Sequence, residues 1–149
     1  MTMNEASGLA LRRAGCALLS IAMLALGPAA RAQPGSLTIE LNKVESTEEG
    51  CRTLFVFDNR TDREFERFRV DLILFDDAGV YQRQVLLDMA PLYAEKKTLA
   101  SFLVADGPCD EIGSILVNDI PQCEDGVGDA IDCVELLQVR SRSDIPLEK

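Results

Sequence analysis

Short segments in which apolar residues recur at every second position fill most of the chain after residue 35, and this pattern constrains the fold most. The longest spans residues 68–75, where Val70, Leu72 and Leu74 occupy alternate positions. A period of two is typical of a β-strand with one buried face, because successive side chains point to opposite sides of a sheet. We therefore predict that these three side chains face a core and that Arg69 lies on the opposite face.

Residues 36–42 alternate in the same way. Leu37 and Ile39 are expected to point into the core, whereas Thr38 and Glu40 are expected to face water. This segment is predicted to form a half-buried strand.

The other strand candidates are shorter apolar runs bounded by turn residues, and they comprise residues 53–57, 81–87, 98–104, 111–118 and 133–141. The last of these also shows helical spacing, but Val139 and the β-rich surroundings favour a strand. The polar residues 45–50 and the acidic, glycine-containing residues 76–79 are typical of loops.

About seven short strands with turn signals between them predict an all-β fold. We expect a single antiparallel β-sandwich of the immunoglobulin or fibronectin type III kind, with a small β-barrel as the alternative. The chain has no tryptophan, so it lacks the buried tryptophan of true immunoglobulin domains. The prediction therefore concerns the architecture and not the immunoglobulin family.

The first 32 residues follow the pattern of an export signal. Two arginines precede a thirteen-residue apolar run, and small residues stand at the positions that a signal peptidase reads. We predict cleavage between Ala32 and Gln33, which leaves a periplasmic domain of residues 33–149. The apolar run would span about 20 Å as a helix, short of the roughly 30 Å of a bilayer core. We therefore expect no membrane anchor after cleavage.

Four cysteines remain in the exported part, namely Cys51, Cys109, Cys123 and Cys133. An even number of cysteines in an oxidising compartment favours two disulfides, and the missing C-x₂-C spacing disfavours a structural zinc site. Three pairings are possible. We predict Cys123–Cys133, which would close a glycine-rich acidic loop, and Cys51–Cys109, which would join two distant segments.

The chain contains no histidine, which excludes Ser-His-Asp and Cys-His catalytic sites and histidine-bound metals. It also lacks the G-x-S-x-G, P-loop and H-E-x-x-H motifs, so we do not expect an enzyme. Cleavage would remove three of 15 basic and one of 25 acidic residues, which leaves a net charge of −12. Nucleic acids and anionic membranes bind clustered lysine and arginine, so neither is an expected partner.

Several stretches of the exported part resemble one group of small exported Gram-negative bacterial proteins. The stretches are SLTIELNKVE (36–45), CRTLFVFDNRT (51–61), DLILFDDAGV (71–80), CDEIGSILVND (109–119) and DCVELLQVRSR (132–142). These proteins are labelled by their signal as twin-arginine pathway signal sequence domain proteins. The resemblance implies an envelope protein with the same cysteine framework, and it carries no catalytic residues across. In this chain Gly15 stands where that signal has phenylalanine.

The segment between Cys123 and Cys133 is the best candidate for a ligand site. It carries four carboxylates on nine residues, namely Glu124, Asp125, Asp129 and Asp132. Calcium prefers six to eight oxygen ligands in a flexible loop, although the spacing here is not that of an EF-hand. A solvated acidic loop is the simpler interpretation.

Two functional hypotheses follow. The first is a non-catalytic periplasmic binding or envelope-accessory module for a protein or other envelope partner, with no cofactor. The alternative is a calcium-dependent binding domain that uses residues 124–132. An exposed apolar patch or an unpaired edge strand would favour the first, and converging carboxylate oxygens would favour the second.

Overall fold

The structure is a computed structural model, and it describes residues 35–128 and 130–149. Within these residues the chain forms strands and one 3₁₀ turn, which confirms the all-β prediction. The elements are β1 (Leu37–Thr47), β2 (Gly50–Asn59), β3 (Phe65–Phe75), β4 (Tyr81–Asp88), β5 (Lys96–Ala105), η1 (Cys109–Glu111), β6 (Ser114–Asp125), β7 (Leu137–Ser141) and β8 (Leu147–Glu148). None of the described segments is a helix long and apolar enough to cross a membrane.

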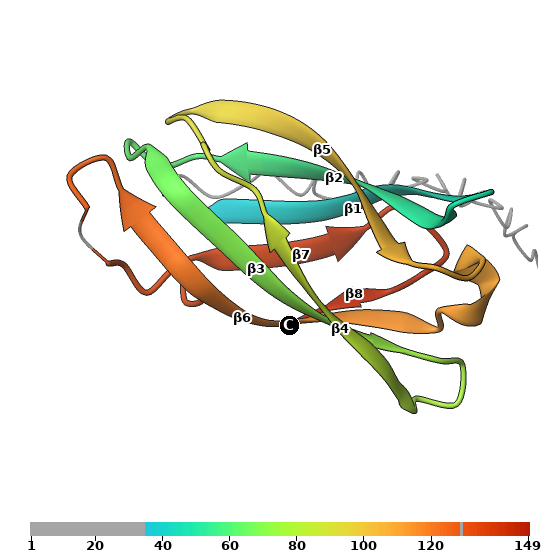
Figure 1. Ribbon diagram of the computed structural model, residues 1–149. Helices are drawn as coiled ribbons and strands as arrows, with labels where there is room; N and C mark the ends of the chain where they lie inside the picture. Colours follow the sequence, from blue (N-terminus) through green and yellow to red (C-terminus); the bar gives the residue numbers. More distant parts are fainter. Residues whose placement is uncertain (1–34, 129) are drawn as a thin grey trace, which may run out of the picture. The chain divides into compact units, whose positions relative to one another are not determined.

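The strands form two four-stranded sheets (Figure 1). One sheet has the order β5-β2-β1-β7 and the other has the order β4-β3-β6-β8. The six long strands pair antiparallel with one another, as predicted. Their inward faces share one hydrophobic core, to which β2 contributes Phe55 and Phe57 and β3 contributes Phe65 and Phe68.

The central strand β3 follows its sequence pattern. Val70, Leu72 and Leu74 are at most 1% exposed and belong to the core, as predicted. Arg69 lies between inward-facing neighbours and forms an ion pair with Asp88 of β4, with 3.7 Å between Nη2 and Oδ2. Each fully buried aliphatic side chain of this size contributes about 1.5–3 kcal/mol of hydrophobic stabilisation.

The prediction for β1 was right for its apolar positions and wrong for its polar positions. Leu37 and Ile39 are buried, but Thr38 and Glu40 are also only 3% and 4% exposed. Glu40 is buried because β7 lies beside β1 and places Arg140 directly across from it. The alternation of apolar and polar residues within one segment does not show which strand will lie beside it.

The predicted loop at residues 45–50 is a tight hairpin instead. β1 continues to Thr47 and β2 begins at Gly50, and these two residues pair across the strands. The Thr47 hydroxyl donates a hydrogen bond to the Gly50 carbonyl over 2.9 Å. Gly50 has a φ of 129°, and a Cβ at this position would collide with the carbonyl oxygen of Ala105. Glycine is therefore required where β5 approaches β2.

The C-terminal part differs from an entirely antiparallel, seven-stranded arrangement. β7 pairs with β1 in parallel, and an eighth strand, β8, pairs with β6 in parallel. The C-terminal residues 143–149 also contribute Ile145 and Leu147 to the core, each 7% exposed. Because β7 and β8 are short, their pairing depends on the sheets that they join more than on their own pattern.

Both predicted disulfides are present. Cys51 of β2 bonds to Cys109 of η1, across 58 residues, and Cys123 of β6 bonds to Cys133, across 10 residues. The first attaches the connection between β5 and β6 to β2. The second attaches the segment before β7 to β6. The predicted signal peptide, with its cleavage site at Ala32 and Gln33, lies outside the described residues.

Candidate functional site

Two of the four acidic residues proposed for calcium belong to a strand and not to a loop. Glu124 and Asp125 are the last residues of β6, where they pair with β3. The Glu124 Oε2 lies 3.3 Å from the Arg67 Nε, directly across the strand pair, and the Asp125 Oδ2 lies 4.0 Å from the Arg63 Nη1. Arginines therefore already accompany both carboxylates.

The other two acidic residues lie beyond β6. Asp132 accepts a hydrogen bond from the backbone N–H of Val134 over 3.2 Å, and Asp129 is outside the described residues. In residues 35–128 and 130–149, no three acidic or cysteine side chains are grouped in a way that could hold a metal ion. The calcium site stays a prediction, and it depends on Asp129.

The outer edge of β5 is a second candidate for a binding site in the described structure. β5 is the last strand of its sheet, it is ten residues long, and residues 98–105 carry no charge. On its solvent side Leu99 is 61% exposed and Leu103 is 40% exposed. A strand edge presents unpaired N–H and C=O groups, so proteins usually protect long edges with charges or proline. β5 has such protection only at its start, from Lys96 and Lys97.

The other three sheet edges of the described chain are less open. β7 and β8 are five and two residues long, so they offer little backbone to a further strand. β4 carries Arg83 and Asp88, and its Gln84 side chain is engaged by the carboxylate of Asp71 at 2.7 Å. Only β5 combines length with an uncharged edge.

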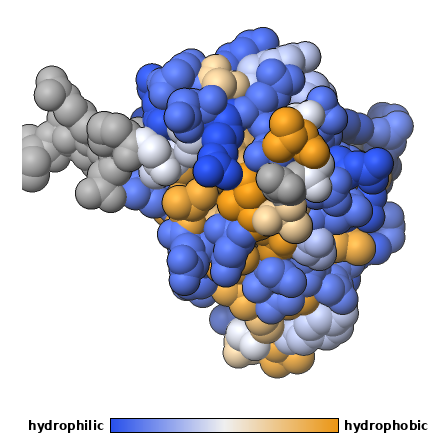
Figure 2. Space-filling model, turned by 90° about the vertical axis from the view of Figure 1, so that its left-hand side faces the viewer, coloured by the Kyte–Doolittle hydropathy of each residue, from blue (hydrophilic) through white to orange (hydrophobic). Residues whose placement is uncertain are grey.

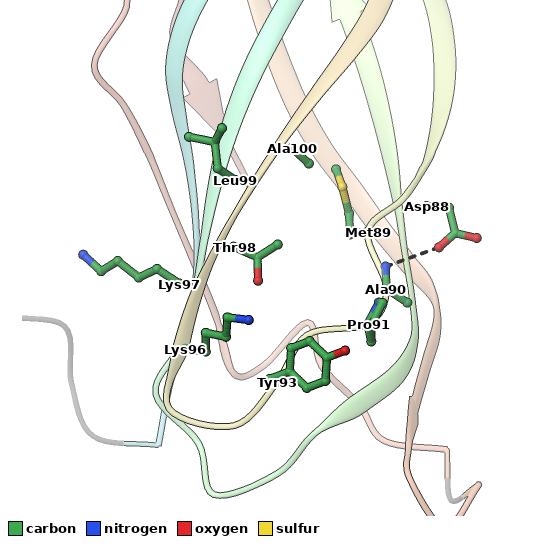
Figure 3. Close-up of a pocket in the computed structure, with 10 residues that line it drawn as sticks. All are labelled: Asp88, Met89, Ala90, Pro91, Tyr93, Lys96, Lys97, Thr98, Leu99 and Ala100. Carbon is green, nitrogen blue, oxygen red and sulfur yellow. Dashed lines mark hydrogen bonds between the residues drawn. The ribbon is translucent and has the colours of Figure 1, made fainter.

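An open groove of about 500 Å³ lies between the start of β5 and the end of β4 (Figure 3). Its wall on β5 includes Thr98 and Ala100, and its opposite wall includes Met89 and Pro91. Figure 2 views the molecule from one end, where hydrophobic surface appears between hydrophilic side chains. The volume of the groove is within the range of ligand-binding sites in proteins, about 300–1,000 Å³.

Lys96 and Tyr93 provide the polar groups at one end of the groove. The Lys96 ammonium lies 4.6 Å from the centre of the Tyr93 ring, a cation–π contact. An ammonium, a phenol and the Thr98 hydroxyl can all donate hydrogen bonds. This chemistry is suited to holding an acceptor such as a carboxylate or a backbone carbonyl.

Glu40 is a buried carboxylate with a shifted pKa, and it lies on the sheet that contains β5. Burial raises its pKa, but hydrogen bonds from Asn42 and Arg142 and the positive charges of Arg140 and Arg142 outweigh burial. The pKa of Glu40 therefore lies below its usual value of 4.5. Because all of its oxygens are engaged by this chain, Glu40 stabilises the fold and is not available to a ligand.

Sequence reasoning identified residues 98–104 as a strand but not as a candidate site. The pattern of one strand does not tell whether it has one neighbour or two. A usable signal was present, because the uncharged run begins directly after Lys96 and Lys97, and lysines are common protection for an edge. Tyr93 and the groove depend on tertiary structure, and no local pattern pointed to them.

Comparison with known proteins places the chain in no established class. It matches no family model, no curated protein and no solved structure. The functional argument therefore depends on the site itself.

Proposed function

We propose that this protein is an exported, non-catalytic binding module of the bacterial periplasm that captures an extended segment of a partner protein along β5. The observation that carries the proposal is the long, uncharged free edge of β5 beside an open groove.

Two features support export to the periplasm. The first 32 residues have the order of charged, apolar and small residues that is typical of a signal peptide. All four cysteines of the remaining chain pair as disulfides, which persist in oxidising compartments and are rare in the cytosol. The resemblance to exported twin-arginine signal proteins agrees with this location.

An immunoglobulin-like sandwich is part of the proposal. The neighbours β1-β2-β5 correspond to strands A-B-E of that fold, and β3-β6 correspond to strands C-F, with β4 in the place of C′. The chain differs at its end, since β8 runs parallel to β6 where the immunoglobulin fold has an antiparallel strand. Sandwiches of this kind commonly serve as binding modules on many unrelated proteins, so the fold alone names no partner.

Strand addition explains how β5 would bind. The backbone of an extended segment would pair with the free N–H and C=O groups of β5 and so lengthen the sheet. Alternate side chains of the added strand would then point to opposite faces. One set would enter the groove beside Ala100, and the other set would lie next to Leu99 and Leu103.

The proposal can be tested by selecting short linear peptides from a display library on the oxidised, exported protein. Hydrogen–deuterium exchange of the complex should show protection of the β5 amides by the enriched peptides. A Leu99→Lys/Leu103→Lys variant should lose most of this binding, because two charges on an edge strand oppose further pairing. Val127→Lys is the matched control, since Val127 is 82% exposed and lies in the loop after β6.

Protection of another surface by the enriched peptides would contradict the proposal. Equal loss of binding in the Val127→Lys control would also contradict it, because that change does not touch β5. Thermal melts of each variant distinguish loss of binding from loss of folding.

A further inference from the structure

We infer that Lys96 recognises an acidic side chain of the segment that binds β5, and that a small apolar side chain two to four residues away in that segment enters the groove beside Ala100. This inference rests on the proposed strand addition and defines the chemistry of the partner. It concerns one end of β5, where the strand edge and the groove meet.

Lys96 is the one basic side chain that forms neither an ion pair nor a side-chain hydrogen bond within the described residues. Ten others form ion pairs, namely Lys43, Arg52, Arg60, Arg63, Arg67, Arg69, Arg83, Lys97, Arg140 and Arg142. Lys149 donates to the carbonyls of Val134 and Leu137. Lys96 instead lies over the ring of Tyr93. In so acidic a protein, this cation is available to an external anion.

The position of Lys96 directs its charge toward the groove. In Figure 3 its side chain points to the groove side of β5, above Tyr93, whereas that of Lys97 points away. The ring of Tyr93 holds the ammonium at 4.6 Å, which limits the freedom of the long side chain. An anion that enters the groove would therefore meet an ammonium that is already positioned.

The other two charged residues that line the groove, Lys97 and Asp88, form ion pairs within the protein. Lys97 pairs with Asp58 of β2 at 3.4 Å. Asp88 pairs with Arg69 at 3.7 Å and accepts the backbone N–H of Ala90 at 3.3 Å. Lys96 is therefore the one charged residue lining this groove that has no ion-pair partner among the described residues. Surface charges interact over about 8–10 Å at physiological salt, so this local charge matters more than the net charge of the whole domain.

The spacing of the partner's side chains follows from the strand period. Lys96, Thr98 and Ala100 lie on the same face of β5, because residues two apart share a face. An added strand in either direction must follow this period. In the added strand, the residue with its carboxylate beside Lys96 and the residue with its apolar side chain beside Ala100 would be two to four positions apart. The groove wall at Met89 favours an apolar group at the second position.

A second copy of this chain fits this site less well. Antiparallel pairing of two β5 strands about Ser101 would place Leu99 of one copy beside Leu103 of the other. The side chains on the groove face would then include Phe102 and Val104, which already pack in their own core. The groove would stay unfilled.

Affinity measurements with designed peptides test the inference. The first probe is an acetylated and amidated peptide of alternating threonine and valine with one central glutamate. The second has glutamine in place of the glutamate, and the third is the glutamine peptide with a free C-terminal carboxylate. Each is titrated into the oxidised exported protein, the Lys96→Gln variant and the Lys97→Gln control, at low and high salt.

We expect the glutamate peptide to bind the unaltered protein about 2- to 5-fold more tightly than the glutamine peptide, which is typical of an exposed ion pair. This preference should disappear in Lys96→Gln, persist in Lys97→Gln, and decrease at high salt.

Four other results would overturn the inference, and they are distinguishable. Equal binding of the glutamate and glutamine peptides, with β5 amides protected, would remove the role of Lys96 and leave strand addition standing. Absence of binding by all peptides would overturn strand addition as well. Preference for the free C-terminus would mean that Lys96 recognises chain ends. Concentration-dependent dimerisation that Leu99→Lys abolishes would make a second copy the occupant.

Discussion

Glu40 of β1 lies directly opposite Arg140 of β7, and the two side chains form an ion pair with 2.7 Å between Oε2 and Nε. Arg142 adds a second ion pair to the same carboxylate at 3.0 Å. Because β1 is the first strand and β7 is the seventh, these contacts connect two distant parts of the sequence. They hold β7 against β1 in the sheet that also contains β5, the proposed binding edge.

Glu40→Gln should lower stability at neutral pH and make unfolding less sensitive to acid. Since the pKa of Glu40 is lower in the folded state, its carboxylate stabilises the fold above about pH 4.5, and this contribution is lost as the pH falls through the lower, folded value. We expect a loss of about 1–3 kcal/mol at neutral pH, which shrinks as the pH falls below the usual pKa of 4.5. Urea unfolding across this pH range measures it.

Glu45→Gln is the matched control, because Glu45 is exposed and its ion pair with Lys43 is on the surface. Its effect should be below about 1 kcal/mol. A loss for Glu40→Gln that stays constant down to acidic pH would show that the carboxylate charge is not the cause.

Leu72→Ala should reduce the free energy of unfolding by about 2–5 kcal/mol, because Leu72 is 1% exposed at the centre of the core. Arg69→Ala, three residues earlier in the same strand, should cost less than about 1 kcal/mol, since it removes only a partly exposed ion pair. Urea denaturation of both variants compares them. Equal losses would mean that the β3 register is wrong.

The two disulfides should stabilise the domain unequally. In the chain-entropy account, a bridge across 58 residues contributes about 4 kcal/mol and one across 10 residues contributes about 3 kcal/mol. Cys51→Ala/Cys109→Ala should therefore be the less stable double variant, compared with Cys123→Ala/Cys133→Ala by denaturant unfolding. The reverse order would show that the short bridge acts mainly through the folded state.

Calcium should not stabilise the oxidised domain more than magnesium at equal ionic strength. Arg67 and Arg63 already accompany Glu124 and Asp125, so a cation would have to displace them. Thermal melts with calcium, magnesium or chelator are expected to overlap. A calcium-specific increase of about 2.7 kcal/mol at a hundred times the dissociation constant would establish the calcium site instead.

Mass spectrometry of the exported protein should give a mature N-terminus at Gln33, because small residues precede this position after the apolar run. Retention of residues 1–32 would contradict both the cleavage and the periplasmic location. An Ala32→Arg variant should block processing and serves to confirm the site.

Much of the fold could be predicted from local patterns. The alternation at Val70, Leu72 and Leu74 indicated a strand and also its buried face. In a strand, successive side chains point to opposite faces, so residues two apart share a face. The even cysteine count favoured two disulfides, and the glycine-rich segment between Cys123 and Cys133 indicated a local pair. The sequence failed at Thr38 and Glu40, whose burial depends on a neighbouring strand far along the chain.

The candidate site shows the same division. An uncharged run after Lys96 and Lys97 predicts a strand, and a net negative charge predicts that nucleic acid is not the partner. The packing of the two sheets decides three features of the site. It places β5 at an edge, the end of β4 beside β5, and Lys96 over Tyr93. Local patterns determine which residues form strands and which faces are apolar, because these follow from backbone geometry. Strand neighbours and free edges were decided only in the tertiary structure, because they depend on contacts between residues that the sequence places far apart.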